Sequence, residues 1–329
     1  MIKISNQIFS LIFTYSKYKN IFLIFFLIST TFIEGLSIAI IFPILEIFIN
    51  KENNNFLYYL IPNLKDENIL LVLLVIISTI FFVKSLFLAL FAWWRTGYHR
   101  ELNKYFRVKL LKNYILNNYL FFIKNKPSIL LRNSYTEISF LIQSIDSFLK
   151  LISEIIFFLI IFFILLYFQP KFTFFIFIIF LLFGIFYFSF IKKKLTLWSN
   201  NKIFYTGKII QNLQQTFDSI KFIKIRNLER RIMDDYNKNV EGFSTYTRLQ
   251  MFASEIPKIF LEIIGVGAIL FLMYLIYDEN QADLSYLIPT LGLLAISAFR
   301  ILPCINRIMN NAQNILNSVA SINAVIKNL

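Results

Sequence analysis

The stretch ILLVLLVIISTIFFVKSLFLALFAWWRTGYHRELNKYFRVKLLKNYILNN, residues 69–118, decides the fold. It contains no proline and one glycine, so little in it would end a helix. Its first part is apolar, and beyond that part apolar side chains recur at every fourth position: Leu102, Phe106, Leu110 and Tyr114. A helix of this length spans about 75 Å, against about 30 Å of hydrocarbon in a bilayer. The stretch therefore predicts one helix that crosses a membrane and continues far into water.

The composition of the whole chain is that of a membrane protein. Hydrophobic residues make up 57% of it and aromatic residues 18%, with a mean hydropathy of +0.65. A soluble domain is about 45–50% apolar with glycine included. Six segments have the length and character of membrane spans: 21–48, 69–91, 151–168, 172–191, 259–277 and 284–303. We expect an all-α membrane protein with six transmembrane helices and long cytoplasmic extensions.

The first residues, 1–20, predict a retained interfacial helix ahead of a six-helix domain, 21–329. They carry Lys3, Lys17 and Lys19 around a short apolar stretch without a small-residue cleavage site, unlike a signal peptide. Ile8 and Ile12 fall near one helical face, which suits a helix lying on the membrane. The alternative is a frayed tail.

The distribution of lysine and arginine sets the orientation. The loops of about 95–150 and 192–258 carry ten and thirteen of these residues, against three in the opposite loops. Positively charged loops stay in the cytoplasm, so both long loops and both termini are predicted to be cytoplasmic. This topology and anionic lipid headgroups also account for most of the net charge of +14, so we expect no nucleic-acid partner.

Each long loop has the pattern of a helical hairpin ending in a short transverse helix. In the first loop, the run 120–125 precedes Pro127, which marks a break. In the second, apolar spacings of three and four descend as far as Ile220 and return from Ile232, and the stretch 218–229 between the two limbs is the natural place for a second transverse helix. The alternative is an ordinary soluble hairpin. Beyond the sixth span, residues 301–326 continue as a coiled-coil-like seam that needs a partner, either its own bundle or a second copy.

Cysteine and histidine each occur once, as Cys304 and His99. The chain therefore has no internal disulfide framework and no metal cluster built from these residues. We expect no metal site, with Cys304 packed in a helix and His99 at the cytoplasmic interface.

Several short stretches carry a resemblance to a known family. They are Glu34 with Ala39 and Pro43-Ile44-Leu45, then Leu130-Leu131-Arg132-Asn133 with Glu137, then Pro257-Lys258 with Leu261-Glu262, and finally Ala298-Phe299-Arg300-Ile301-Leu302-Pro303 with Asn306-Arg307-Ile308. With six spans and two tall loops, the whole chain resembles the transmembrane domain of an ATP-binding-cassette (ABC) exporter. Within that superfamily the stretches resemble the flippases of lipid-linked oligosaccharides. Asp218-Ser219 stands where that subgroup tends to have glycine before Ile220, and Lys258 where arginine is common.

The resemblance implies alternating access in a domain-swapped dimer of two such chains, driven by nucleotide-binding ATPase domains that hold ATP and Mg²⁺. The chain itself would bind no cofactor. The residues implied to couple to the ATPase are Leu120, Phe121 and Phe122 in the first loop and Phe217, Ile220, Lys221 and Phe222 in the second.

The chain lacks the phosphate loop that an ATPase of this kind needs. No G-x-x-x-x-G-K-[ST] motif occurs in it, and Gly207-Lys208 lacks the preceding glycine-rich turn. We therefore expect no catalytic residues and no enzyme activity in this chain. It ends at Leu329, about where a fused cassette would begin, so the ATPase is expected to be a separate protein, or to be lost or trimmed away.

Ionisable residues at membrane depth predict a substrate cavity, because such side chains are costly in lipid and face a partner or a cavity. Lys84, Lys258 and Arg300 could bind a lipid diphosphate, with Glu34 nearby. The alternatives are ion pairs between helices and snorkelling of the lysines to the headgroups. Outside the membrane, Phe56, Tyr58 and Tyr59 in the loop 51–68 suit either an external interfacial helix or an aromatic belt.

Three functions are consistent with this sequence pattern. The first is an ATP-driven exporter in a bacterial inner membrane that flips a lipid-linked oligosaccharide or a similar amphipathic lipid. The second is a degenerate or truncated exporter subunit without transport activity. The third is an ion-driven secondary transporter, against which the eight glycines and mostly uninterrupted spans argue.

Overall fold

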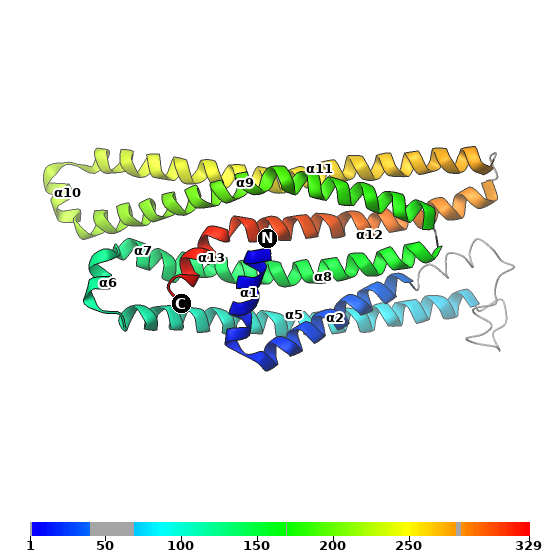
Figure 1. Ribbon diagram of the computed structural model, residues 1–329, viewed down its shortest axis with the longest axis horizontal. Helices are drawn as coiled ribbons and strands as arrows, with labels where there is room; N and C mark the ends of the chain where they lie inside the picture. Colours follow the sequence, from blue (N-terminus) through cyan, green and yellow to red (C-terminus); the bar gives the residue numbers. More distant parts are fainter. Residues whose placement is uncertain (1, 40–68, 169, 281–283) are drawn as a thin grey trace.

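The chain is almost entirely helical in a computed structural model that describes residues 2–39, 69–168, 170–280 and 284–329 (Figure 1). The elements are α1 (Ile2–Tyr15), α2 (Lys17–Ala39), α5 (Ile69–Ile115), α6 (Tyr119–Lys124), α7 (Pro127–Arg132), the π-helical turn η2 (Asn133–Glu137), α8 (Ile138–Phe168), α9 (Pro170–Asp218), α10 (Ile220–Arg226), α11 (Glu229–Asn280), α12 (Leu284–Asn317) and α13 (Val319–Ile326). The predicted all-helical class is confirmed for these residues.

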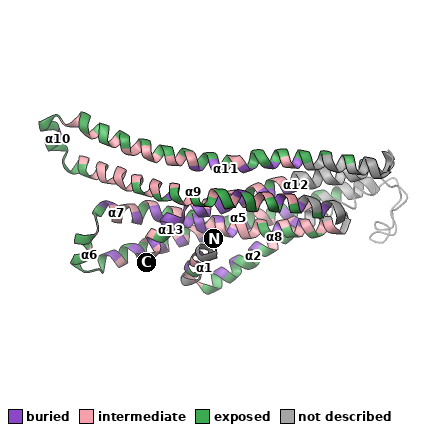
Figure 2. Ribbon diagram, turned by 45° about the horizontal axis from the view of Figure 1, so that its top comes forward, coloured by how far each residue is buried: buried purple, intermediate pink, exposed green. Residues whose placement is uncertain are grey.

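The long helices run side by side along one axis and form two hairpins (Figure 1). Helices α6 and α7 join α5 to α8, and α10 joins α9 to α11 at the same end of the molecule. Helix α12 packs against α8 and α11, so it ties one hairpin to the other. In a second view, the α9–α11 hairpin carries exposed residues along much of its length (Figure 2).

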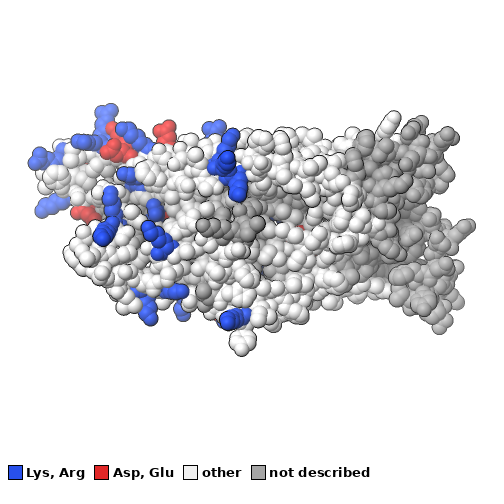
Figure 3. Space-filling view, viewed as in Figure 1, with Lys and Arg blue, Asp and Glu red and all other residues white. Residues whose placement is uncertain are grey.

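Charge divides the molecule along its long axis. Lysine and arginine gather at the end that holds α6 and α10, and the neighbouring described surface is largely uncharged (Figure 3). Among the described residues, three helical stretches are long and apolar enough to cross a membrane: Lys17–Gly35, Ser78–Ile115 and Pro127–Ile164. These stretches support membrane association. The spans predicted at 172–191, 259–277 and 284–303 include residues whose side chains lie outside the described part, so six spans stay a prediction.

The charged half has a core of its own. Leu102, Phe106 and Leu110 on α5 and Leu141 and Ile145 on α8 are all completely buried. The four-residue spacing on α5 places its apolar side chains on one face, and that face packs against α8. The predicted extension of α5 into water is therefore supported by a conventional hydrophobic seam.

The N-terminal helix differs from its prediction. Helix α1 lies across the bundle rather than along it, which suits a helix in the membrane plane (Figure 1). However, Ile8, Leu11 and Ile12 are buried in the same core as α5 and α8, so the apolar face assigned to lipid contacts protein. Phe9, on another face, is 47% exposed.

The last two helices form the predicted seam against their own bundle. Ile305, Ala312 and Ile315 on α12 and Ile322 on α13 are buried. Both helices contact α8, and the seam turns at Ser318, where α12 ends and α13 begins. Of the two partners that the sequence left open, the seam uses the chain's own bundle.

Phe106→Ala should lower the free energy of unfolding by about 3–5 kcal/mol, because it empties a fully buried site between α5 and α8. Val108→Ala, at a site 59% exposed on the same helix, should change it by less than about 0.5 kcal/mol. Thermal unfolding of both purified variants in detergent measures the difference. Equal melting temperatures would show that the cytoplasmic seam contributes little.

Candidate functional site

A polar cavity of about 490 Å³ lies where α2, α5, α8 and α12 meet; we call it the inner cavity. Its polar and charged lining residues are Thr30, Thr31 and Glu34 from α2, Arg95 from α5, Lys150, Ser153 and Glu154 from α8, and Arg307, Asn310 and Asn311 from α12. Leu88 and Phe91 add an apolar wall. Arg95, Lys150 and Arg307 lie at or just beyond the predicted cytoplasmic ends of three spans, so the cavity is expected at the inner membrane surface.

The charges of the inner cavity are partly paired. Arg307 Nε donates to Glu154 Oε1 at 2.6 Å, which joins α12 to α8. Three buried atoms have no hydrogen-bond partner among the described residues: Arg95 Nε, Glu154 Oε2 and Asn310 Oδ1. Buried polar atoms are costly without partners, so the cavity suits water or the polar head of a ligand.

Asp146 organises the cations behind the inner cavity. Its carboxylate lies 2.6 Å from Lys150 Nζ and 2.9 Å from His99 Nε2, and 4.0 Å from Arg95 Nε. His99 therefore joins α5 to α8 by a side-chain contact rather than facing the interface alone. The cluster fixes the positions of two of the three cations that line the cavity.

The inner cavity contains one of the four residues that the sequence assigned to a substrate site. Glu34 lines it. Lys84 is 8% exposed on α5, with Nζ 5.2 Å from the ring centre of Phe81, and lies eleven residues before Arg95. Lys258 is exposed on α11, and the side chain of Arg300 on α12 lies outside the described part. The structure therefore does not bring Lys84 and Lys258 to this cavity, because they sit on other turns and faces of their helices.

In the sequence, Arg95 and Lys150 mark the ends of a predicted loop, and Arg307 belongs to one of the stretches that carry the family resemblance. A local signal existed: Asp146, Lys150 and Glu154 follow at intervals of four and share one face of α8. Pairing across helices, such as Glu154 with Arg307, has no signal in a single sequence.

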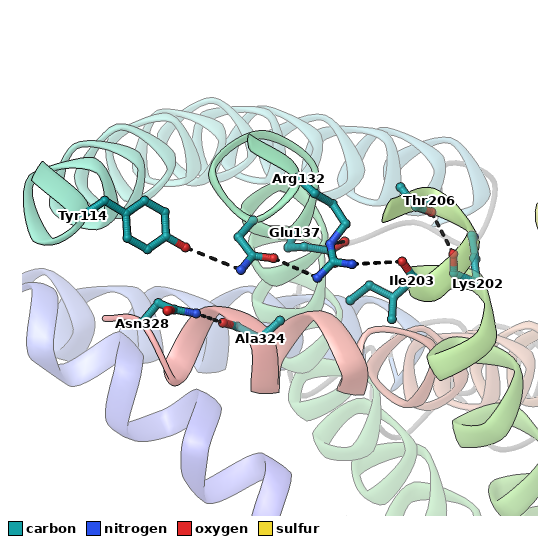
Figure 4. A network of polar contacts seen from close by, with 9 residues as sticks. Tyr114, Arg132, Glu137, Lys202, Ile203, Thr206, Ala324 and Asn328 are labelled. Carbon is teal, nitrogen blue, oxygen red and sulfur yellow. Dashed lines mark hydrogen bonds and ion pairs between the residues drawn. The ribbon is translucent and has the colours of Figure 1, made fainter. Parts of the chain in front are cut away.

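A second polar network ties the two hairpins together in the charged half (Figure 4). Arg132 Nη1 donates to the backbone oxygen of Ile203 on α9 at 3.1 Å, and Nη2 donates to Asn133 Oδ1 at 3.1 Å. Its Nε lies 3.4 Å from Oε1 of Glu137, which is 1% exposed. A Cβ at Gly207 would lie 2.8 Å from Arg132 Nη1, so glycine there permits this close approach.

Lys202 on α9 lies beside that network in a second polar cavity, of about 330 Å³. Its Nζ donates to Gln250 Oε1 at 3.2 Å and lies 5.5 and 5.6 Å from the ring centres of Phe140 and Phe243. Burial lowers the pKa of Lys202, and the charge of Glu137 partly opposes this shift. The folded protein thus holds this proton more weakly than the unfolded chain, so the charged lysine costs stability, and that cost declines as the pH rises through the folded pKa.

The transverse helices form as predicted, with small shifts in their ends. Helix α6 covers Tyr119–Lys124 against the predicted 120–125, and Pro127 begins α7 at the first-turn position that suits proline. Helix α10 covers Ile220–Arg226, inside the predicted 218–229. Asn227 ends it in the left-handed conformation with φ 51°, where asparagine is tolerated.

Most of the residues expected at the coupling surface are exposed. Leu120 and Phe122 on α6 are 59% and 40% exposed, and Ile220 and Phe222 on α10 are 45% and 54% exposed. Lys221 is exposed on α10, while Phe217, also exposed, belongs to the end of α9 instead.

Phe121 differs from the other coupling residues, because it is only partly exposed and packs on Tyr114 with ring centres 5.7 Å apart. It anchors α6 to α5 rather than presenting a free ring.

The expected external helix, with Phe56, Tyr58 and Tyr59, lies outside the described residues. A scan of the sequence against models of known protein families gives no match.

Arg132→Met should lower the free energy of unfolding by about 3 kcal/mol, because it leaves the buried carboxylate of Glu137 without its neighbouring cation. The double variant Arg132→Met with Glu137→Gln should recover much of the loss, since it removes the buried charge as well. Thermal unfolding of the two single variants and the double variant completes the cycle. Additive losses would mean that the pair is not coupled.

Proposed function

We propose that this chain is the membrane subunit of an ATP-driven exporter of the ABC type. The observation that carries the proposal is the pair of short, exposed helices α6 and α10, which turn across the ends of two long helical hairpins at the same end of the molecule (Figure 1). Two such helices are suited to receive force from a soluble partner and pass it along the hairpins.

The chemistry of these two helices fits a docking role. Each presents exposed apolar side chains, with Phe122 on α6 and Phe222 on α10, next to cations such as Lys124 and Lys224. Lys224 Nζ is fixed by Glu229 Oε1 at 2.9 Å, which braces α10 against α11. We propose that an ATPase partner covers this surface and holds the ATP and Mg²⁺, while this chain hydrolyses nothing.

The inner cavity suits the head of an amphipathic anionic lipid. Arg95, Lys150 and Arg307 line it together with an apolar wall from α5. Glu154 pairs with Arg307 and Asp146 with Lys150, while the buried Nε of Arg95 has no hydrogen-bond partner among the described residues. Arginine can bind phosphate through two parallel hydrogen bonds. Lipid-linked oligosaccharides have a head of this kind, with sugars attached to the phosphate. We propose that such a lipid enters from the inner leaflet of a bacterial inner membrane, with both termini of the chain in the cytoplasm.

A second copy of the chain is part of the proposal. On the α9–α11 hairpin, large apolar side chains remain exposed beyond the predicted spans; Leu197 is 56%, Phe204 55% and Met251 66% exposed. Large apolar side chains exposed outside the membrane are typical of a protein interface. A domain-swapped homodimer would cover them and would enclose a transport path between the two copies.

Phe222→Asp should abolish binding of the ATPase partner, since it places a charge in the contact that buries this ring. Val108→Asp, at a site of similar exposure on the shaft of α5, should leave binding unchanged. Co-purification of the ATPase from the native host with each tagged variant measures this. Equal recovery with both variants would remove α10 from the coupling surface. Absence of any ATPase with the parent chain would favour a degenerate subunit or an ion-driven carrier.

Arg95→Gln should slow ATP-dependent flipping of an anionic lipid at least about tenfold, because a charge-assisted hydrogen bond contributes about 1.5–3 kcal/mol. Lys193→Gln, at an exposed site on α9, serves as the control. Flipping is followed in proteoliposomes with a fluorescent lipid phosphate and an outside quencher, beside ATPase turnover to show that the complex assembles. Equal rates in both variants would remove Arg95 from the transport path.

A further inference from the structure

A groove of about 740 Å³ lies between the first turns of α2 and the middle of α5, apart from the inner cavity. Tyr18, Lys19 and Phe22 line it from α2, and Trp93, Gly97 and Arg100 line it from α5. We call it the interfacial groove. Its volume is within the range of about 300–1,000 Å³ that is typical of ligand sites.

The interfacial groove lies at the level of the lipid headgroups. The span predicted on α5 ends at residue 91, and Trp93 to Arg100 occupy the next two to three turns, about 3–13 Å beyond it at the rise of an α-helix. On the other wall, α2 begins at Lys17, so its first turn lies at the same inner surface. Both walls therefore pass from apolar to charged residues at this depth.

The aromatic side chains of the groove are unusually exposed. Tyr18 is 87%, Trp93 78% and Phe22 46% exposed. The neighbouring Trp94 packs on Phe22, with the two ring centres 5.1 Å apart. Exposed tryptophan and tyrosine are typical of the membrane interface, where the ring contacts acyl chains and glycerol and the polar edge contacts water. Gly97 has no atom within 4 Å of the position that a Cβ would take, so the floor of the groove is open.

The charge of the groove selects an anion. Lys19 Nζ lies 2.5 Å from Glu101 Oε2, which also accepts a hydrogen bond from the Tyr15 hydroxyl at 2.7 Å, so these groups satisfy one another. Arg100 is exposed and makes no hydrogen bond or ion pair with any residue that the structure describes. Its guanidinium is therefore free to bind the oxygens of a phosphate.

We propose that the interfacial groove binds an anionic phospholipid of the cytoplasmic leaflet, such as phosphatidylglycerol. Arg100 holds the phosphate, Trp93 and Tyr18 contact the glycerol and the upper acyl chains, and the headgroup lies over Gly97. The lipid bridges α2 and α5 at the point where α1 crosses the bundle. This site requires that α2 and α5 enter the membrane and is independent of transport.

The chain carries its own probes for this site. It has three tryptophans, of which Trp93 and Trp94 lie in the groove and Trp198 lies on α9. In a Trp198→Phe background, brominated lipids quench only the groove tryptophans. At equal mole fractions in phosphatidylcholine vesicles, brominated phosphatidylglycerol should bind with an apparent affinity about fivefold higher than brominated phosphatidylcholine. The attraction of one basic residue to an anionic membrane surface raises the affinity by about this factor.

Two variants and a control test the assignment. Arg100→Gln should remove the preference for phosphatidylglycerol, whereas Lys112→Gln, exposed on the same helix and beyond the groove, should retain it. Gly97→Leu should fill the groove and reduce quenching by both lipids without lowering the melting temperature, because a leucine there meets open space and favours the helix. Equal quenching of the parent protein by the two lipids, or an unchanged preference in Arg100→Gln, would overturn the proposal.

Discussion

The structure depends on helices that are suited to hydrocarbon along one part of their length and to water along the other. In hydrocarbon every backbone polar group has to be satisfied within the chain, which favours uninterrupted helices. In water the same helices need an apolar face turned inward. Helix α5 meets both needs, since it exposes Phe82, Val83 and Leu86 on its membrane half and buries Leu102 and Phe106 on its charged half. The change of pattern along one helix indicates where the membrane surface is expected, and the cavities and charge clusters described above lie at or beyond that level.

The charges at this level hold the bundle together rather than forming an open basic patch. Asp146 gathers cations from α5 and α8, and Glu154 holds Arg307 of α12. A buried ion pair adds little net stability, because desolvation offsets the attraction, but it penalises other arrangements of the helices. The clusters therefore serve to fix which helices surround the inner cavity, while atoms such as Arg95 Nε remain available to a polar ligand.

Much of the fold followed from the sequence because its signals are local. The four-residue spacing of α5, the break at Pro127 and the turn between α9 and α11 are read from neighbouring residues. The inner cavity was only partly predictable, since Glu154 and Arg307 are far apart in the chain and pair through helix packing. The same limit explains α1 and Phe121: amphipathic spacing identifies an apolar face, but it does not say whether lipid or protein covers that face.

The network around Arg132 links the two hairpins near the end of the molecule that carries α6 and α10. Arg132 ends α7, close to α6, and donates to the backbone of Ile203 on α9, the helix that leads to α10. Its approach is allowed by Gly207, and its charge is matched by the buried Glu137. Separating the hairpins would break the hydrogen bond from Arg132 to the backbone of Ile203, whereas the contacts of Arg132 with Asn133 and Glu137 lie within one hairpin. Within one chain, this hydrogen bond and the packing of α7 on α9 therefore hold together the ends of the two hairpins that carry α6 and α10.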